Sequence, residues 1–226
     1  YFDKENLKST FIGHPLLEED SSSKIDITKI IKDKKKILSI FPGSRSSELD
    51  VLNPILFDFI RKMNEKYNDL FFIFHCTSEH VKLIQNLLLK EGFKNCGAIG
   101  DEKIKSEILK ASIFAVSKSG TISLEICNAK IPSIIIYKMG IINFFIVKKL
   151  TKVKFANIIN IAANKEIIPE LLQSNCNPDN IFNVVDKLLN NKDELKKQVA
   201  KSQEIISNFK TEKSAKIASS IIENYL

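Results

Sequence analysis

The chain has 226 residues, of which 44% are hydrophobic and 27% are charged, and this composition excludes a generally disordered protein. Its length corresponds to one large domain or two small ones. The net charge of +7 excludes a uniformly basic coat for nucleic acid, because the excess lies in one stretch. Between Glu125 and Glu166 there are seven lysines and no acidic residue, and elsewhere 27 basic residues balance 27 acidic ones.

The cysteines and the hydrophobic runs indicate in which cellular compartment the protein resides. Four widely spaced cysteines without a CxxC pair indicate reduced thiols in the cytosol and no structural metal site (Cys76, Cys96, Cys127, Cys176). No apolar run approaches the ~18 residues of a spanning helix, and no signal peptide is evident. Because the first residue is Tyr1 and not Met, we expect the chain to begin inside a longer protein.

From residue 37 onward, apolar runs alternate with helical patterns. The runs predict strands at 37–41, 70–74, 96–99, 113–116 and 133–137. The three-to-four-residue periodicity predicts helices near 49–63, 81–90, 103–110 and 119–129. Pro54 is expected to kink the first helix or to mark its start, and Gly92 to end the second. Along these strands apolar and polar residues do not alternate, which indicates burial on both faces. The pattern therefore predicts a Rossmann-like, doubly wound parallel sheet with helices on both faces.

Beyond residue 137 the pattern changes. We expect a helix over 141–150, an irregular Asn-rich stretch to about 165, and helices near 178–190, 192–208 and 212–225. The predicted division of the chain is a loop or linker over 1–25, a Rossmann-like domain over 26–175 and C-terminal helices over 176–226.

Two strand-to-helix turns have the composition of anion sites. In the first, Gly43 permits close backbone approach, Ser44 and Ser46 can cap the helix, and Arg45 adds a cation. The second runs through Ser119, Gly120 and Thr121. Free amides and the helix dipole favour a phosphate at both turns, although ordinary capping explains either turn alone. Neither turn matches the P-loop pattern GxxxxGK(S/T), which disfavours a P-loop kinase or ATPase.

The remaining polar residues leave alternatives open. Glu125 lies one helical turn after Thr121, where it could accept hydrogen bonds from a ribose diol or be an ordinary surface glutamate. His14, between a glycine and a proline, is more often structural than catalytic in such a setting. His75 and His80 lack partners at metal-ligand spacing. The residues offer no convincing general base.

The acid-free stretch combines apolar and aromatic residues with lysines over 138–154. Such a composition is typical of a segment that contacts an anionic membrane surface. It is equally typical of a helix that packs on the core and leaves its lysines in solvent. Nucleic acid is disfavoured as a partner, because the stretch contains no arginine.

Several segments, in one order and spacing, closely resemble lipid-A-disaccharide synthase, a bacterial glycosyltransferase of the GT-B fold. They are residues 11–16, residues 42–48, Ser119 to Thr121 with Glu125, residues 137–139, residues 157–160 and residues 169–173. The resemblance covers the chain from about residue 2 to its end, and it implies the C-terminal, nucleotide-binding half of such an enzyme.

The resemblance implies transfer of 2,3-diacylglucosamine from its UDP form to 2,3-diacylglucosamine 1-phosphate, without a metal or cofactor. Arg45 and Asn160 match functionally important positions. The implied donor site comprises Gly43, Ser44, Arg45, Ser119, Gly120, Thr121, Glu125, Tyr137, Asn160 and Glu170. The acceptor site and the base are expected in an N-terminal domain missing from this chain, so this half alone is expected to be inactive. The implied location is the cytoplasmic face of the inner membrane of a Gram-negative bacterium, and a homodimer is left open.

The sequence departs from the family pattern at Ile159, where the family has proline, and around Asn164, where it has glycine. Two alternative functions remain. One is another UDP-sugar enzyme of the same fold, of the N-acetylglucosaminyltransferase or 2-epimerase type. The other is a non-catalytic nucleotide-binding module.

Overall fold

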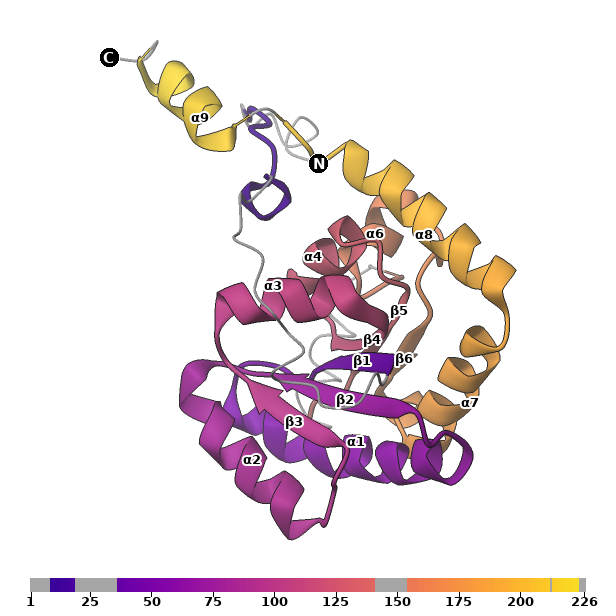
Figure 1. The fold of residues 1–226 in the computed structure, drawn as a ribbon. Coiled ribbons are helices and arrows are strands. Elements are labelled where there is room, and N and C mark those ends of the chain that lie inside the picture. Colours follow the sequence, from indigo (N-terminus) through magenta and orange to yellow (C-terminus); the bar gives the residue numbers. More distant parts are fainter. Residues whose placement is uncertain (1–8, 19–35, 141–153, 212, 224–226) are drawn as a thin grey trace.

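One parallel sheet organises the computed structural model, which describes residues 9–18, 36–140, 154–211 and 213–223 (Figure 1). Its strand order is β3-β2-β1-β4-β5-β6, and every neighbouring pair runs parallel. The strands are β1 (Lys36–Phe41), β2 (Leu70–His75), β3 (Cys96–Ile99), β4 (Ser112–Lys118), β5 (Ser133–Tyr137) and β6 (Glu170–Leu172). The helices are α1 (Ser46–Lys66), α2 (Val81–Lys90), α3 (Glu102–Ala111), α4 (Ile122–Asn128), α6 (Ile158–Ala163), α7 (Pro178–Leu189), α8 (Lys192–Ser207) and α9 (Ser214–Glu223).

Helices cover both faces of the sheet, as the unalternating strands predict. Leu38 and Ile40 of β1 belong to one core cluster with residues of α1, α2 and α7. Ile37 and Phe41 belong to clusters with residues of α3, and Phe41 also packs with α4. Successive side chains of a strand point to opposite faces, so a strand buried on both faces must be apolar at consecutive positions. Figure 1 shows α1 and α2 on one side of the sheet and α3 and α4 on the other.

Two helix boundaries differ from the sequence prediction. Helix α1 begins at Ser46, so Pro54 lies inside the helix and does not mark its start. The missing amide of a proline is tolerated there because the buried face of α1, including Leu52 and Leu56, is held by the core. Helix α4 begins at Ile122, three residues later than predicted, and the preceding turn is therefore left as loop.

The region after β5 contains two elements that the sequence pattern did not predict. Helix α6 lies in the Asn-rich stretch, and β6 pairs with β5 at the edge of the sheet. Asn157 caps α6 by accepting a hydrogen bond from the Ile159 amide at 2.8 Å. Asn164 ends α6 with a φ of 47°, a left-handed conformation that glycine and asparagine tolerate, so asparagine can replace the family's glycine. The helix expected over 141–150 falls outside the described residues.

The last helices attach to the sheet domain in different ways. Helix α7 packs on α1, and α8 packs on α4 and α6. The buried Gln198 of α8 both accepts from the Ser133 amide at 2.8 Å and donates to the Ser133 carbonyl at 2.9 Å. These two bonds tie α8 to the start of β5, since an unpaired buried backbone group is costly.

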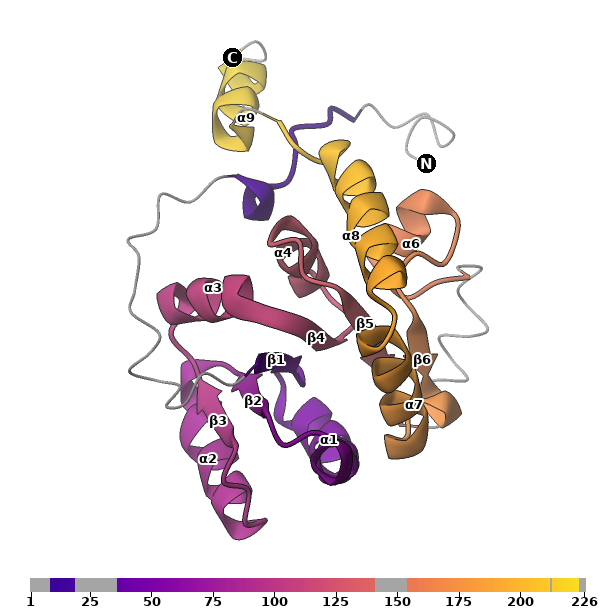
Figure 2. The ribbon, with the colours of Figure 1, turned by 45° about the vertical axis from the view of Figure 1, so that its right-hand side comes forward.

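The described N-terminal residues reach the chain just before α9 (Figure 2). Thr211 donates to the Ile12 carbonyl at 2.9 Å, and the Ser214 amide donates to Glu18 at 2.7 Å. His14 accepts from the Leu16 amide through Nδ1 at the start of a short 3₁₀ helix, Pro15–Leu17, which gives this histidine a structural use. Among the helices of the described ranges, none has both the length and the apolar character that crossing a membrane requires.

Candidate functional site

The turn between β1 and α1 requires a glycine. Gly43 adopts a φ of 118°, which side-chain-bearing residues rarely adopt. A Cβ built on Gly43 would lie 2.4 Å from Oε2 of Glu48 and 3.0 Å from its Cβ. The absence of a side chain therefore lets Glu48 fold back over the turn.

The carboxylate of Glu48 already occupies the anion position of this turn. Its Oε2 accepts from the amides of Ser44 at 3.1 Å and Arg45 at 3.4 Å. Its Oε1 accepts from Nζ of Lys118, on β4, at 2.8 Å. Burial of the carboxyl opposes ionisation, but the bonds from Lys118 and from the two amides outweigh it and lower the pKa of Glu48. This turn therefore holds an anion with two backbone amides and an ammonium.

The predicted caps of α1 are not the ones the structure uses. Arg45 is the N-cap residue, and no hydroxyl of Ser44 or Ser46 caps the helix; Glu48 satisfies the amides instead. The Ser46 hydroxyl lies 3.2 Å from Nε2 of His80. The Arg45 guanidinium is 80% exposed, and its nearest described carboxylate oxygen is Oε1 of Glu48 at 3.7 Å. Its charge thus remains accessible beside the turn.

The second turn, after β4, lies next to the first. Ser119 is anchored twice, because its amide donates to the Ile136 carbonyl at 3.1 Å and its hydroxyl donates to the Ala156 carbonyl at 2.7 Å. A Cβ added to Gly120 would meet no atom within 4 Å, so the space above this glycine is open to a ligand.

A cavity of about 280 Å³ joins the two turns at the carboxyl ends of β1, β2 and β4. Six of the predicted donor-site residues line it: Gly43, Ser44, Ser119, Gly120, Thr121 and Glu125. Its other lining residues include His75, Lys105 and Lys118. The carboxyl ends of strands at the point where strand order reverses are where open parallel sheets bind ligands.

The four other predicted site residues do not line this cavity: Arg45, Tyr137, Asn160 and Glu170. The ring of Tyr137 lies beneath the Lys118 ammonium, 5.3 Å from ring centroid to nitrogen. Asn160 is fully buried and uses its amide within the protein. It donates to the Ile168 carbonyl and to Glu170, both at 2.7 Å, and accepts from the Ile167 and Ile168 amides.

Glu170 links this buried group to the cavity wall. Its carboxylate accepts from the Ala156 amide at 2.7 Å and from the Asn157 amide at 3.0 Å. Because the Ala156 carbonyl in turn accepts from the Ser119 hydroxyl, the network of Asn160 and Glu170 supports the turn after β4. The structure places these two residues behind the cavity, not in it.

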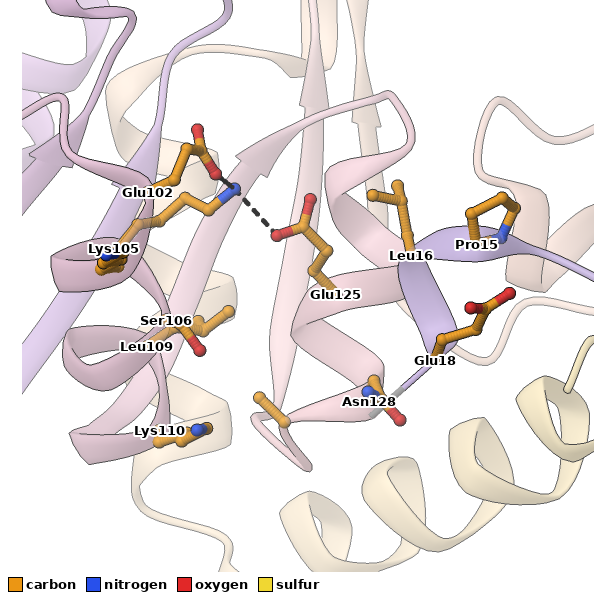
Figure 3. A pocket seen from close by; sticks show the side chains of 12 residues that line it. Pro15, Leu16, Glu18, Glu102, Lys105, Ser106, Leu109, Lys110, Glu125 and Asn128 are labelled. Carbon is orange, nitrogen blue, oxygen red and sulfur yellow. Dashed lines mark ion pairs between the residues drawn. The ribbon is translucent and has the colours of Figure 1, made fainter. Parts of the chain in front are cut away.

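Lys105, which the sequence pattern did not single out, holds Glu125 in place (Figure 3). Its Nζ lies 2.9 Å from Glu125 and also pairs with Glu102. Burial of the ammonium lowers its affinity for the proton, but the two carboxylates outweigh burial and raise the pKa of Lys105. The three side chains also line a second cavity of about 680 Å³ between α3, α4 and residues 15–18, so they stand where the two cavities meet.

His75 is a second residue that the pattern left without a role. It lines the smaller cavity, is 5% exposed and stacks on Phe41 with ring centroids 4.2 Å apart. Burial, and to a smaller extent the charge of Lys105, lowers the pKa of His75 to about 3. The only feature of the sequence that could have pointed to His75 as a site residue was its position at the end of a predicted strand. No group of residues suited to a metal ion occurs in the described ranges.

A family model described as lipid-A-disaccharide synthetase matches residues 1–223. The chain is 35% identical over 213 residues to the lipid-A-disaccharide synthase of Rickettsia prowazekii, covering 92% of this chain and 55% of that protein. It is 36% identical over 214 residues to the synthase of Rickettsia typhi, covering 93% and 56%. The chain therefore spans about half the length of the curated relatives it matches.

Solved structures share the fold at low sequence identity. The S. aureus MnaA–UDP co-structure matches 92% of this chain and 49% of that chain, with a TM-score of 0.60 and 14% identity. The C-terminal domain of a glycosyl transferase group 1 family protein from Francisella tularensis matches 76% of this chain and 85% of that domain, with a TM-score of 0.51 and 15% identity. These likenesses support a GT-B type Rossmann-like domain.

The buried histidine makes stability depend on pH. His75 has a pKa of about 3 when folded and about 6.5 when unfolded, so the unfolded chain binds more protons between these values. The stability that the buried neutral ring contributes to the folded state is fully present above about pH 6.5. It is lost as the pH falls toward 3. Relative to His75→Gln, the wild type should lose about 2 kcal/mol of unfolding free energy between pH 7 and pH 5 in urea titrations. Parallel pH dependence in the two proteins would contradict this expectation.

Proposed function

The chain belongs to the lipid-A-disaccharide synthase family, and we propose that it forms the half of a glycosyltransferase of lipid A biosynthesis that binds the UDP-sugar donor. The reaction proposed for the whole protein transfers 2,3-diacylglucosamine from its UDP form to 2,3-diacylglucosamine 1-phosphate. The products are the lipid A disaccharide 1-phosphate and UDP.

One observation carries the proposal. The cavity at the switch point of strand order already holds a carboxylate on the amides of Ser44 and Arg45 and on the ammonium of Lys118. A diphosphate carries more charge than the Glu48 carboxylate and has more acceptor oxygens, so it can compete for the same donors. The exposed guanidinium of Arg45 adds a bidentate partner at the same turn.

These donors suit the charge that develops during glycosyl transfer. As the bond between the sugar and the diphosphate breaks, negative charge grows on the leaving UDP. Fixed amides and the cations of Arg45 and Lys118 stabilise that charge in place, which lowers the barrier. On the other side of the cavity, the Glu125 carboxylate, held by Lys105, can accept hydrogen bonds from the ribose diol. Asn160 and Glu170 act through the Ser119 turn that they support.

The cavity residues do not supply a free general base. Glu48 is paired with Lys118, and Glu102 and Glu125 are paired with Lys105. Burial, and to a smaller extent the charge of Lys105, lowers the pKa of His75 to about 3, so its ring is too weak a base to hold a transferred proton. We therefore propose that the base and the acceptor site belong to another domain of the protein, and that this half alone binds donor without transferring sugar. If donor screening favoured another UDP-sugar, a different enzyme of the same fold would replace this proposal.

Replacing Arg45 tests the diphosphate site. Arg45→Ala should weaken UDP binding by about 10- to 100-fold, because charge-assisted hydrogen bonds contribute about 1.5–3 kcal/mol each, and calorimetry measures the change. Arg61→Ala is the matched control on the same helix, since Arg61 pairs with Asp58 and Glu91 away from the cavity. Unchanged affinity for UDP in Arg45→Ala would refute the assigned role.

We also propose that the protein associates peripherally with the cytoplasmic face of the inner membrane through the basic, apolar stretch at 138–154. Most of that stretch, 141–153, lies outside the described residues. The support is its composition, since each lysine near an anionic surface contributes about 1 kcal/mol.

Flotation with anionic vesicles tests this association. The chain should float with phosphatidylglycerol vesicles at low salt and much less at 0.5 M salt, because screening weakens the attraction. Replacing Lys148, Lys149 and Lys152 by glutamine should reduce flotation severalfold. The control makes the same charge change on α8, at Lys196, Lys197 and Lys201. No flotation at low salt, or equal loss in both variants, would contradict the proposal.

A further inference from the structure

A buried relay of hydrogen bonds determines which nitrogen of His75 carries the proton. The Ser112 hydroxyl donates to the Ile108 carbonyl at 2.8 Å, and this bond uses its single hydrogen. In its 2.7 Å contact with Ser39, Ser112 must therefore accept, and Ser39 must donate. The hydrogen of Ser39 is then also used, so in the 2.8 Å contact with Nε2 of His75 the serine accepts. The neutral ring therefore carries its hydrogen on Nε2 and a lone pair on Nδ1.

That lone pair has no partner among the described residues. Nδ1 of His75 is buried without a hydrogen bond, on a ring that lines the cavity and stacks on Phe41, another lining residue. A buried acceptor without a donor is unfavourable, and a ligand that brings an N–H or O–H into reach recovers the lost bond. The low pKa of His75 keeps the ring neutral, so Nδ1 stays an acceptor throughout the physiological range.

The strand order places this acceptor away from the anion turn. Strand β2, which ends in His75, lies on one side of β1, and β4, which ends in Lys118, lies on the other. A nucleotide whose diphosphate lies at the turns after β1 and β4 can direct its base toward the end of β2. Its ribose hydroxyls are donors suited to the Glu125 carboxylate, which leaves the base to supply the donor for Nδ1.

We propose that His75 is a specificity-determining residue that accepts a hydrogen bond from the imide N3–H of uracil, and this rests on the proposed function. Cytosine has a lone pair at N3 where uracil has a hydrogen, so Nδ1 would face another acceptor. Methylation of uracil at N3 removes the hydrogen and adds bulk at the same position. His75 therefore selects uridine nucleotides over both.

Two isosteric substitutions separate the two ring nitrogens. Glutamine at position 75 places its amide near Nε2, so His75→Gln retains a donor toward Ser39 and removes the acceptor. Asparagine places its amide near Nδ1, so His75→Asn retains an acceptor for the base and removes the donor toward Ser39. Calorimetry on the 226-residue chain with UDP, CDP, 3-methyl-UDP and 2′-deoxy-UDP reads the consequences.

The wild type should bind UDP at least tenfold more tightly than CDP or 3-methyl-UDP. His75→Gln should lose about tenfold in UDP affinity, equivalent to about 1.4 kcal/mol, with little change for CDP. His75→Asn should retain most of the preference for UDP. If His75→Gln does not fold, equal wild-type affinity for UDP and 3-methyl-UDP still overturns the inference, and so does loss of the preference for UDP in His75→Asn, which keeps the acceptor.

The outcomes distinguish this inference from the proposed function. If the wild type binds UDP and His75→Gln keeps the full preference over CDP, the role of His75 is wrong and the donor site stands. If His75→Gln instead changes only the preference for UDP over 2′-deoxy-UDP, the acceptor contacts ribose and the inference is overturned. If the wild type binds no uridine nucleotide, the proposed function itself fails.

Discussion

The pairing of β1 with β4 brings the two turns of the candidate site together. These strands are far apart in the sequence, yet Phe41 lies opposite Ser117 in the parallel register, so their carboxyl ends reach the same edge. The turns that follow them, through Gly43 and through Ser119, then line one cavity. Strand order reverses between β1 and β4, and the helices diverge there to opposite faces of the sheet, which leaves room for a ligand.

The charges around this cavity are arranged in pairs that cross between elements. Glu48 on α1 meets Lys118 on β4, and Glu125 on α4 meets Lys105 on α3. Each pair holds a carboxylate in a defined position, while Arg45 leaves its charge exposed beside the first turn. The ring of His75 at the end of β2 is itself neutral, and the charge of Lys105 acts on it. The proposed diphosphate and base would therefore lie at different ends of one cavity.

Local patterns in the sequence were sufficient for much of the fold. The strands and most helices were predicted because apolar periodicity reports burial directly, as in α1, where Leu49 to Met63 repeat every three or four residues. The positions of the two turns were predicted because a glycine and serines follow a strand, and their use as anion sites stays a prediction. Strand β6 was missed, since a three-residue edge strand is too short for a periodic signal, and α6 was missed because asparagines suggested a loop.

The details of the site depend on partners that are distant in sequence. The position of the proton on His75 follows from Ser39 and Ser112, which reach it only when β1, β2 and β4 pair. Asn160 matches a functionally important position by resemblance, but only its contacts with Ile168 and Glu170 show that it supports the site from behind. No local sequence pattern indicates such contacts. The sequence therefore predicted the position of the cavity better than the contacts that its residues make.

The central claim is that the amides after β1 receive the diphosphate of a uridine nucleotide. Nuclear magnetic resonance on ¹⁵N-labelled chain, titrated separately with UDP and with uridine, tests it most directly. UDP should shift the amide resonances of Ser44, Arg45 and Gly120 strongly, and uridine should leave those of Ser44 and Arg45 nearly unmoved. Shifts confined to the larger cavity, for example at Ser106 and Asn128, with Ser44 and Arg45 unaffected by UDP, would contradict it.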